Sequence, residues 1–137
     1  RFIQTHRDPV EVLPSICSLC EILQGASSDE VDKNAIGTHW RKRLKNIFKD
    51  MRSRANAEQF LDVQYADLVG DPLGTVRHIY DYHSYEYSDD FEEAMKQWLT
   101  NNQQHKHGAH QYTLEEFGLD AAGVRSDFTA YCEEFDL

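Results

Sequence analysis

Apolar residues recur at steps of three and four along several stretches of the chain, which predicts amphipathic helices. The first stripe follows a proline and consists of Val10, Leu13, Ile16, Cys17 and Cys20. The second and longest consists of Ile36, Trp40, Leu44, Ile47, Phe48 and Met51. Three later stripes comprise Leu73, Val76, Ile79 and Tyr80; Phe91, Met95, Trp98 and Leu99; and Val124, Phe128 and Tyr131. We expect these positions to be the buried faces of helices.

Two short segments, 2–5 and 60–65, are predicted to be strands. Each leads to an Asp-Pro pair, Asp8-Pro9 and Asp71-Pro72, which suits a helix N-cap followed by the first helical position. We interpret residues 66–70 as the short connection between the second strand and its helix. Strand, connection and helix repeated in this order predict an α/β fold in which both strands share a parallel sheet.

Polar breaks separate the remaining elements. They cover residues 25–34, a tyrosine-rich segment at 82–87, and 101–112. Ser27 with Glu30 could form a capping box or belong to a surface loop, whereas Ser88, Thr113 with Glu116, and Asp120 suit later helix starts.

The length and composition predict one globular domain over residues 1–137, because 40% of the residues are hydrophobic and 12% aromatic. No apolar run approaches the ~20 residues needed to span a membrane. The chain opens at Arg1, inside or beside a strand and without an initiator methionine. We therefore expect it to be part of a longer protein.

The three cysteines do not fit a metal or redox site well. Cys17 and Cys20 form a CxxC pair inside a predicted helix, and Cys132 would be a single further ligand. Zinc sites need a fourth ligand, and redox pairs usually open a helix. Buried free thiols are the preferred interpretation, which favours the cytoplasm.

Charge is distributed unevenly along the chain. Residues 1–56 contain ten basic and seven acidic side chains, and residues 57–137 contain four and seventeen. A polyanionic ligand should therefore approach the first half. Seven basic residues lie in the helix predicted near 36–54: Arg41, Lys42, Arg43, Lys45, Lys49, Arg52 and Arg54. They form either an anion-binding stripe or a solvated face, and the acidity of the whole chain argues against nucleic acid.

Two segments carry candidate binding chemistry. In the first, Arg7 lies between a strand and a helix N-terminus, and Ser15 follows eight residues later on the same expected face. Arg7 either binds a phosphate there or pairs with Asp8 or Glu11. The second segment contains Lys106, His107 and Gly108, flanked by His105 and His110. It suits an anion better than a metal, because no carboxylate or cysteine lies at matching spacing; a surface lysine is the alternative.

Three segments in this order resemble the sulfotransferase family, and specifically its bacterial-type branch. They are Thr5-His-Arg-Asp-Pro-Val-Glu-Val-Leu-Pro-Ser15, Tyr65-Ala-Asp-Leu-Val-Gly-Asp-Pro72, and the segment 106–119. The resemblance implies a P-loop-NTPase-like sulfotransferase fold, a parallel sheet flanked by helices, of which this chain is an incomplete, helix-rich C-terminal part. It also implies the donor 3′-phosphoadenosine-5′-phosphosulfate (PAPS) as co-substrate, and no metal.

The resemblance further implies roles for individual residues. Arg7 and Ser15 match the family's ligands of the donor 3′-phosphate. Tyr65 matches a residue beside the adenine, with Ala66 where an acidic residue is common. Lys106, His107 and Gly108 match, more loosely, a basic loop that closes over the 3′-phosphate, where cytosolic relatives prefer Arg-Lys-Gly.

The family's phosphosulfate-binding loop and its general base lie upstream of the segments matched here. The catalytic residues are therefore unknown. The only reason to consider His6 as the general base is its position beside Arg7. The expected function is sulfuryl transfer from PAPS to a hydroxyl or amine acceptor by the longer protein, with this chain alone inactive. The alternative is a non-catalytic nucleotide- or anion-binding module that uses Arg7 and the 41–54 basic helix. The acceptor and the oligomeric state, including a homo-oligomer, are left open.

Overall fold

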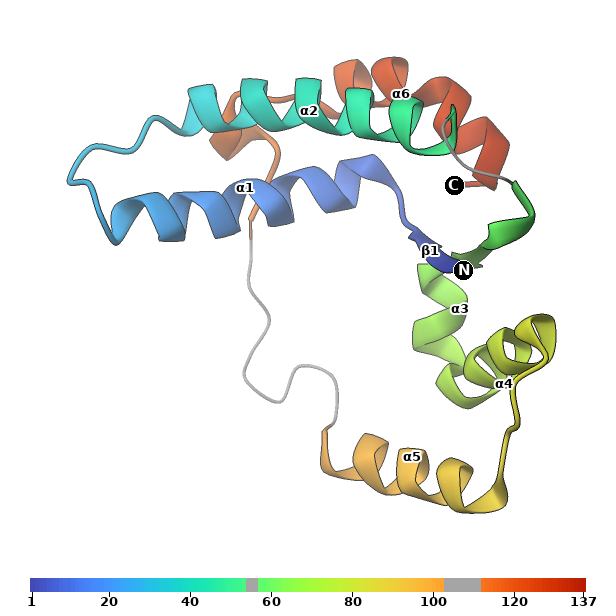
Figure 1. Cartoon of the computed structure of the whole chain (residues 1–137). Coiled ribbons are helices and arrows are strands. Elements are labelled where there is room, and N and C mark those ends of the chain that lie inside the picture. The colour runs from blue at the N-terminus through green and yellow to red at the C-terminus, as the bar shows by residue number, and fades with distance from the viewer. Residues whose placement is uncertain (54–56, 103–111) are drawn as a thin grey trace. The chain divides into compact units, whose positions relative to one another are not determined.

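The computed structural model describes residues 1–53, 57–102 and 112–137. In these residues two short strands occur among a larger number of helices (Figure 1). The elements are β1 (Phe2–His6), α1 (Pro9–Gly25), α2 (Lys33–Ser53), η1 (Ala57–Gln59), β2 (Phe60–Gln64), α3 (Tyr65–Gly70), α4 (Pro72–His83), α5 (Asp89–Asn101), η2 (Glu115–Phe117) and α6 (Ala121–Phe135).

The chain forms two compact units, Arg1–His6 with Glu58–His110, and Arg7–Ala57 with Gln111–Leu137. In the first unit β1 pairs with β2 in parallel, from Phe2 opposite Phe60 to His6 opposite Gln64. The parallel sheet expected from the sequence is therefore confirmed. The rings of Phe2 and Phe60 stack with centroids 4.9 Å apart, so an aromatic pair fixes the register where the two strands begin.

The connection predicted for residues 66–70 is wrong, because these residues are helical in α3. Gln64 is its N-cap residue but makes no side-chain capping bond, so the usual sequence signal for a helix start is missing. Asp71 ends α3 and begins α4, and its side chain accepts a hydrogen bond from the Gly74 N–H at 2.9 Å. The second Asp-Pro pair therefore caps α4 as predicted.

Helices α4 and α5 are held together by an aromatic pair and a charged network. The rings of Tyr80 and Phe91 stack at 5.1 Å, and Glu92 pairs with both Arg77 and Lys96. Hydrogen bonds from Lys96 and Arg77 lower the pKa of Glu92 to about 2. The prediction that Trp98 is buried is wrong, because 63% of this residue is exposed.

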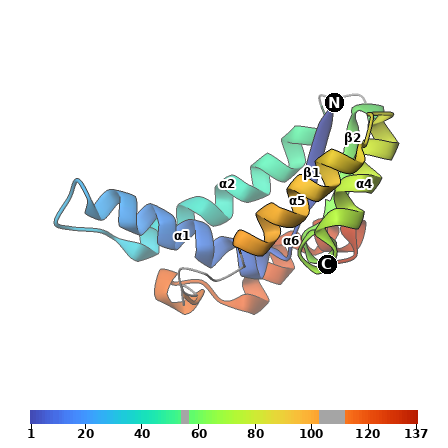
Figure 2. The same cartoon turned by 90° about the horizontal axis from the view of Figure 1, so that it is seen from below.

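The second unit is a layer of three helices. Figure 2 shows α1 and α2 side by side, and α6 packs against both. The predicted stripes meet in its main core, where the buried residues are Leu13, Leu44, Leu114, Leu119, Val124 and Phe128. Asp8 and Asp120 cap α1 and α6 as expected, through bonds to the N–H groups of Val10 and Gly123.

A glycine permits close packing between α2 and η2. A Cβ atom at Gly37 would collide with the backbone carbonyl of Phe117, whose side chain is completely buried. Gly118 then ends η2 with a φ of 66°, a conformation that other residues rarely adopt. These two glycines let the segment before α6 lie directly on α2.

The cysteines are core residues rather than a pair exposed for redox chemistry. Cys17 is completely buried and Cys20 is half-buried, and both thiols are free. The indole N–H of Trp40 donates to the Cys20 sulfur at 3.0 Å. The pKa of the Cys17 thiol is raised to about 11, mainly by burial and to a smaller extent by the nearby Cys20.

We predict that Leu13→Ala lowers the free energy of unfolding by about 2.5–4 kcal/mol, because it leaves a cavity among three packed helices. Leu19 on the same helix is 57% exposed, so Leu19→Ala is the matched control and should change stability by less than about 0.5 kcal/mol. Urea unfolding followed by circular dichroism measures both. Equal losses in the two variants would show that this core is misassigned.

We also predict that Cys17 is the last thiol to react with an alkylating reagent at pH 8. Its buried sulfur is almost entirely protonated at that pH, whereas the thiolate is the reactive species. Mass spectrometry after timed alkylation gives the order of modification, and alkylation in denaturant should remove the difference. Early modification of Cys17 in the native protein would contradict its burial.

Candidate functional site

Arg7 occupies the two-residue turn between the end of β1 and the start of α1. His6 is the last residue of the strand, and Asp8 is the helix N-cap. Pro9 follows in the first helical turn and is buried, and its fixed φ suits the start of the helix. Local sequence therefore places a cation at the N-terminus of a helix of 17 residues.

The side chain of Arg7 lies along the first turns of α1. Its Nε donates to the Glu11 carboxylate at 2.8 Å, and 37% of the side chain is exposed. Ser15 follows Glu11 by four residues in α1, so these two side chains share a helix face. The pairing of Arg7 with Glu11, one of the alternatives from the sequence, is present. Whether Arg7 and Ser15 bind a phosphate remains a prediction.

The backbone N–H groups at this helix start are already bonded. The N–H of Val10 donates to the Asp8 side chain, and those of Glu11 and Val12 donate to the Asp8 carbonyl. Pro9 has no N–H. An anion at this end of α1 would therefore be bound by side chains and favoured by the helix dipole, rather than held by these amides.

Tyr65 occupies the equivalent place after the other strand. It is half-buried and opens α3 directly after Gln64, the last residue of β2. Gln64 is the register partner of His6, which precedes Arg7. Arg7 and Tyr65 thus each follow the carboxyl end of one of two paired parallel strands, the end at which α/β proteins bind ligands.

The remaining predicted site residues, Lys106, His107 and Gly108, lie outside the described residues. The neighbouring histidines, His105 and His110, do so too. Within the described ranges no three His, Cys, Asp or Glu side chains are grouped so that they could hold a metal ion. Anion binding by Lys106, His107 and Gly108 therefore stays a prediction.

A polar pair between the buried last residue of β1 and an exposed residue of β2 was not anticipated from the sequence. His6 is 1% exposed, and its Nε2 lies 2.8 Å from an Asp62 carboxylate oxygen on β2. Strand alternation with the parallel register could have indicated it, since His6 and Asp62 both occupy even positions of paired strands.

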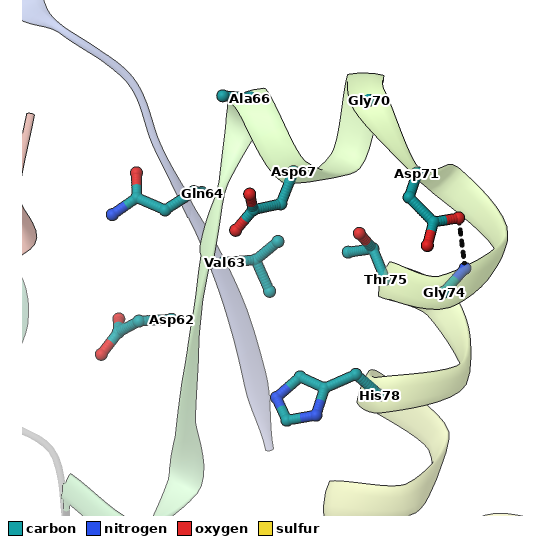
Figure 3. A pocket seen from close by; sticks show the side chains of 10 residues that line it. All are labelled: Asp62, Val63, Gln64, Ala66, Asp67, Gly70, Asp71, Gly74, Thr75 and His78. Carbon is teal, nitrogen blue, oxygen red and sulfur yellow. Dashed lines mark hydrogen bonds between the residues drawn. The ribbon is translucent and has the colours of Figure 1, made fainter.

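A pocket of about 540 Å³ lies beside β2, between α3 and α4 (Figure 3). Asp67, Thr75 and His78 point into the space next to Val63, whereas Asp62 and Gln64 lie on the other side of the strand. The lining contains three carboxylates, those of Asp62, Asp67 and Asp71. Carboxylates disfavour a polyanionic donor, so this pocket is not where we look for the nucleotide.

Some of the basic side chains of α2 make contacts within the protein. Arg41 and Lys45 both pair with Asp127 on α6, at 2.7 and 2.8 Å, and Arg41 also donates to the Gly123 carbonyl. The Lys45 and Arg41 hydrogen bonds lower the pKa of the Asp127 carboxyl. Arg43 lies over the Trp40 ring at 5.6 Å. These contacts favour a structural explanation of the stripe over a dedicated anion-binding one.

Among the described residues, no helix has the length and apolar character needed to cross a bilayer.

Known proteins with similar sequences and structures are sulfotransferases. The omega-hydroxy-beta-dihydromenaquinone-9 sulfotransferase Stf3 of Mycobacterium bovis is 26% identical over 122 residues, which are 85% of this chain and 31% of that protein. The same enzyme from Mycobacterium tuberculosis gives the same values. The chain therefore spans about a third of the length of these curated relatives.

Two crystal structures show the same relationship. Sulfotransferase STF9 from Mycobacterium avium matches all of this chain with a TM-score of 0.85 and 25% identity, and the match covers 36% of STF9. Sulfotransferase STF1 from Mycobacterium tuberculosis matches 93% of this chain with a TM-score of 0.73 and 30% identity, and 33% of STF1 is covered.

The family model of sulfotransferases matches residues 1–89, which include β1, α1, α2, β2, α3 and α4. The P-loop-like α/β fold and the family expected from the sequence motifs are thereby confirmed. This chain belongs to the sulfotransferase family.

Proposed function

We propose that the protein is a PAPS-dependent sulfotransferase, and that this chain binds the 3′-phosphate and adenine end of the donor. Family membership supports sulfuryl transfer. The observation that carries the donor-binding role is the strand register, since Arg7 and Tyr65 follow two paired parallel strand ends. Ligands of open α/β sheets bind at such ends.

The residues present fit a nucleotide phosphate. The planar guanidinium of Arg7 suits phosphate oxygens and is partly exposed at the positive end of the α1 dipole. Glu11 holds its Nε, which orients the guanidinium without neutralising its charge entirely. A Ser15 hydroxyl on the Glu11 face would donate to the same phosphate, and Tyr65 would pack against the adenine.

PAPS supplies the sulfuryl group and leaves as adenosine 3′,5′-bisphosphate. The residues assigned here bind and orient the nucleotide, remote from the reacting sulfur. Binding energy at such a remote group positions the reactive end for attack by an acceptor hydroxyl or amine. We assign no general base within the chain, and we propose that Lys106, His107 and Gly108 add to the 3′-phosphate site.

The acceptor class is left at a hydroxyl or amine compound. The printed name of Stf3 describes a hydroxylated dihydromenaquinone as its substrate, but this chain covers about a third of that enzyme. The buried free thiol of Cys17 suits a reducing compartment, so we place the protein in the cytoplasm.

We predict that Arg7→Ala weakens binding of adenosine 3′,5′-bisphosphate by about 1.5–3 kcal/mol, roughly 10- to 150-fold, through loss of a charged hydrogen-bond partner. Titration calorimetry on the full-length protein measures the affinity. Arg43→Ala is the control, because it removes an exposed cation from the basic helix, and its affinity should equal that of the wild type.

The same pair of variants tests the alternative function. A module that binds anions through the basic helix would lose affinity in Arg43→Ala. Unchanged affinity in Arg7→Ala would remove this residue from the donor site.

We further predict that the 137-residue chain on its own does not transfer a sulfuryl group, whereas the full-length protein does. The chain covers about a third of its curated relatives, and no base has been assigned in it. Release of adenosine 3′,5′-bisphosphate from PAPS, assayed with a panel of phenols, alcohols and amines, measures the activity of both. Turnover by the chain alone would show that it contains a complete catalytic site.

A further inference from the structure

The hydrogen-bonded pair of His6 and Asp62 joins the last residue of β1 to the middle residue of β2. The Nε2 atom of His6 lies 2.8 Å from the Asp62 carboxylate, and the histidine is 1% exposed. Asp62 itself has 40% of its side chain exposed, so the pair connects a buried ring to a carboxylate in contact with water. A polar ring placed in the interior needs such a partner, because an unsatisfied buried polar group is costly.

The two ends of the sheet are fixed by different interactions. Where the strands begin, Phe2 and Phe60 stack without directional bonds. At the end of β1 the interaction is a hydrogen bond with a fixed geometry, which joins His6, the residue before Arg7, to Asp62 in the middle of β2. A directional bond limits sliding of one strand along the other more strictly than a ring stack does.

Burial also argues against direct contact between His6 and a substrate. A ring with 1% exposure has almost no surface with which to contact a substrate. His6 is therefore not the missing base, and an effect on function has to pass through residues next to it.

We propose that His6 and Asp62 are positioning residues for the donor: their bond fixes the last residue of β1 against β2, and so sets the point from which Arg7, the next residue, reaches the 3′-phosphate. This inference rests on the proposed function. A hydrogen bond to a phosphate weakens steeply when its donor is displaced or misaligned. Loss of the bond should therefore weaken recognition of the 3′-phosphate without removing either binding residue.

The test compares two nucleotides on the full-length protein. Adenosine 3′,5′-bisphosphate carries the phosphate that Arg7 is proposed to bind, and adenosine 5′-monophosphate lacks it. The variants are His6→Phe, which keeps a ring of similar shape, and Asp62→Ala. We expect each to weaken binding of the bisphosphate by roughly tenfold and to leave binding of the monophosphate within about twofold.

Conservative variants and a structural control separate positioning from general destabilisation. His6→Gln and Asp62→Asn keep a donor and an acceptor, and should recover most of the bisphosphate affinity. Asp127→Asn weakens the ion pairs between α2 and α6 and should lower the melting temperature without changing the ratio of the two affinities.

Each outcome bears on one of the two proposals. Equal weakening of both nucleotides by His6→Phe, or wild-type affinities in both His6→Phe and Asp62→Ala, would overturn the positioning role while leaving the donor site intact. Failure of the wild-type protein to prefer the bisphosphate would instead overturn the proposed function. A double variant of Arg7→Ala with His6→Phe should be no weaker than Arg7→Ala alone, because His6 acts through Arg7.

Discussion

The parallel pairing of β1 with β2 is the constraint on which the proposed site depends. Parallel strands run in one direction, so their carboxyl ends fall at the same edge, and the residues that follow them leave from neighbouring points. In this chain those residues are Arg7 and Tyr65, which are separated by more than fifty positions in sequence. Without this register, the residues proposed to bind the phosphate and the adenine would not follow paired strands.

The anion site proposed at Arg7 lies among acidic residues. Asp8 bonds the first N–H groups of α1, and Glu11 bonds the Arg7 Nε, so both carboxylates are engaged with the protein. Negative side chains in a first helical turn are also favoured by the helix dipole. They stabilise the geometry that presents the guanidinium, but they reduce the local positive potential. Affinity for a phosphate at this point must therefore come from directional bonds more than from general attraction, which is the chemistry that a guanidinium provides.

Local signals predicted the helices and caps well, because Asp8, Asp71, Ser88 and Asp120 each act through the next few residues. They failed at α3, whose start has no capping side chain, and at Trp98, whose apolar ring is exposed. The sequence named Arg7 and Tyr65 through motifs, but the His6–Asp62 bond joins residues 56 positions apart. Such a bond depends on strand register, which is a tertiary property. The Arg7–Glu11 pair was among the alternatives, since it needs only one helical turn.

The difference between local signals and position in the fold also explains why we propose Arg7, rather than the basic helix, as the anion-binding feature. Seven cations in one predicted helix suggested an anion-binding stripe, yet Arg41 and Lys45 pair with Asp127, and Arg43 lies over Trp40. Arg41 and Lys45 thus bond the neighbouring helix α6, whereas the side chains of Lys49, Arg52 and Arg54 lie outside those that the structure describes. Arg7 has a different setting, because it follows a strand, precedes a capped helix and pairs with Glu11 one turn along that helix. Position relative to the strand ends, rather than the local density of charge, is therefore the reason for proposing Arg7 as the binding residue.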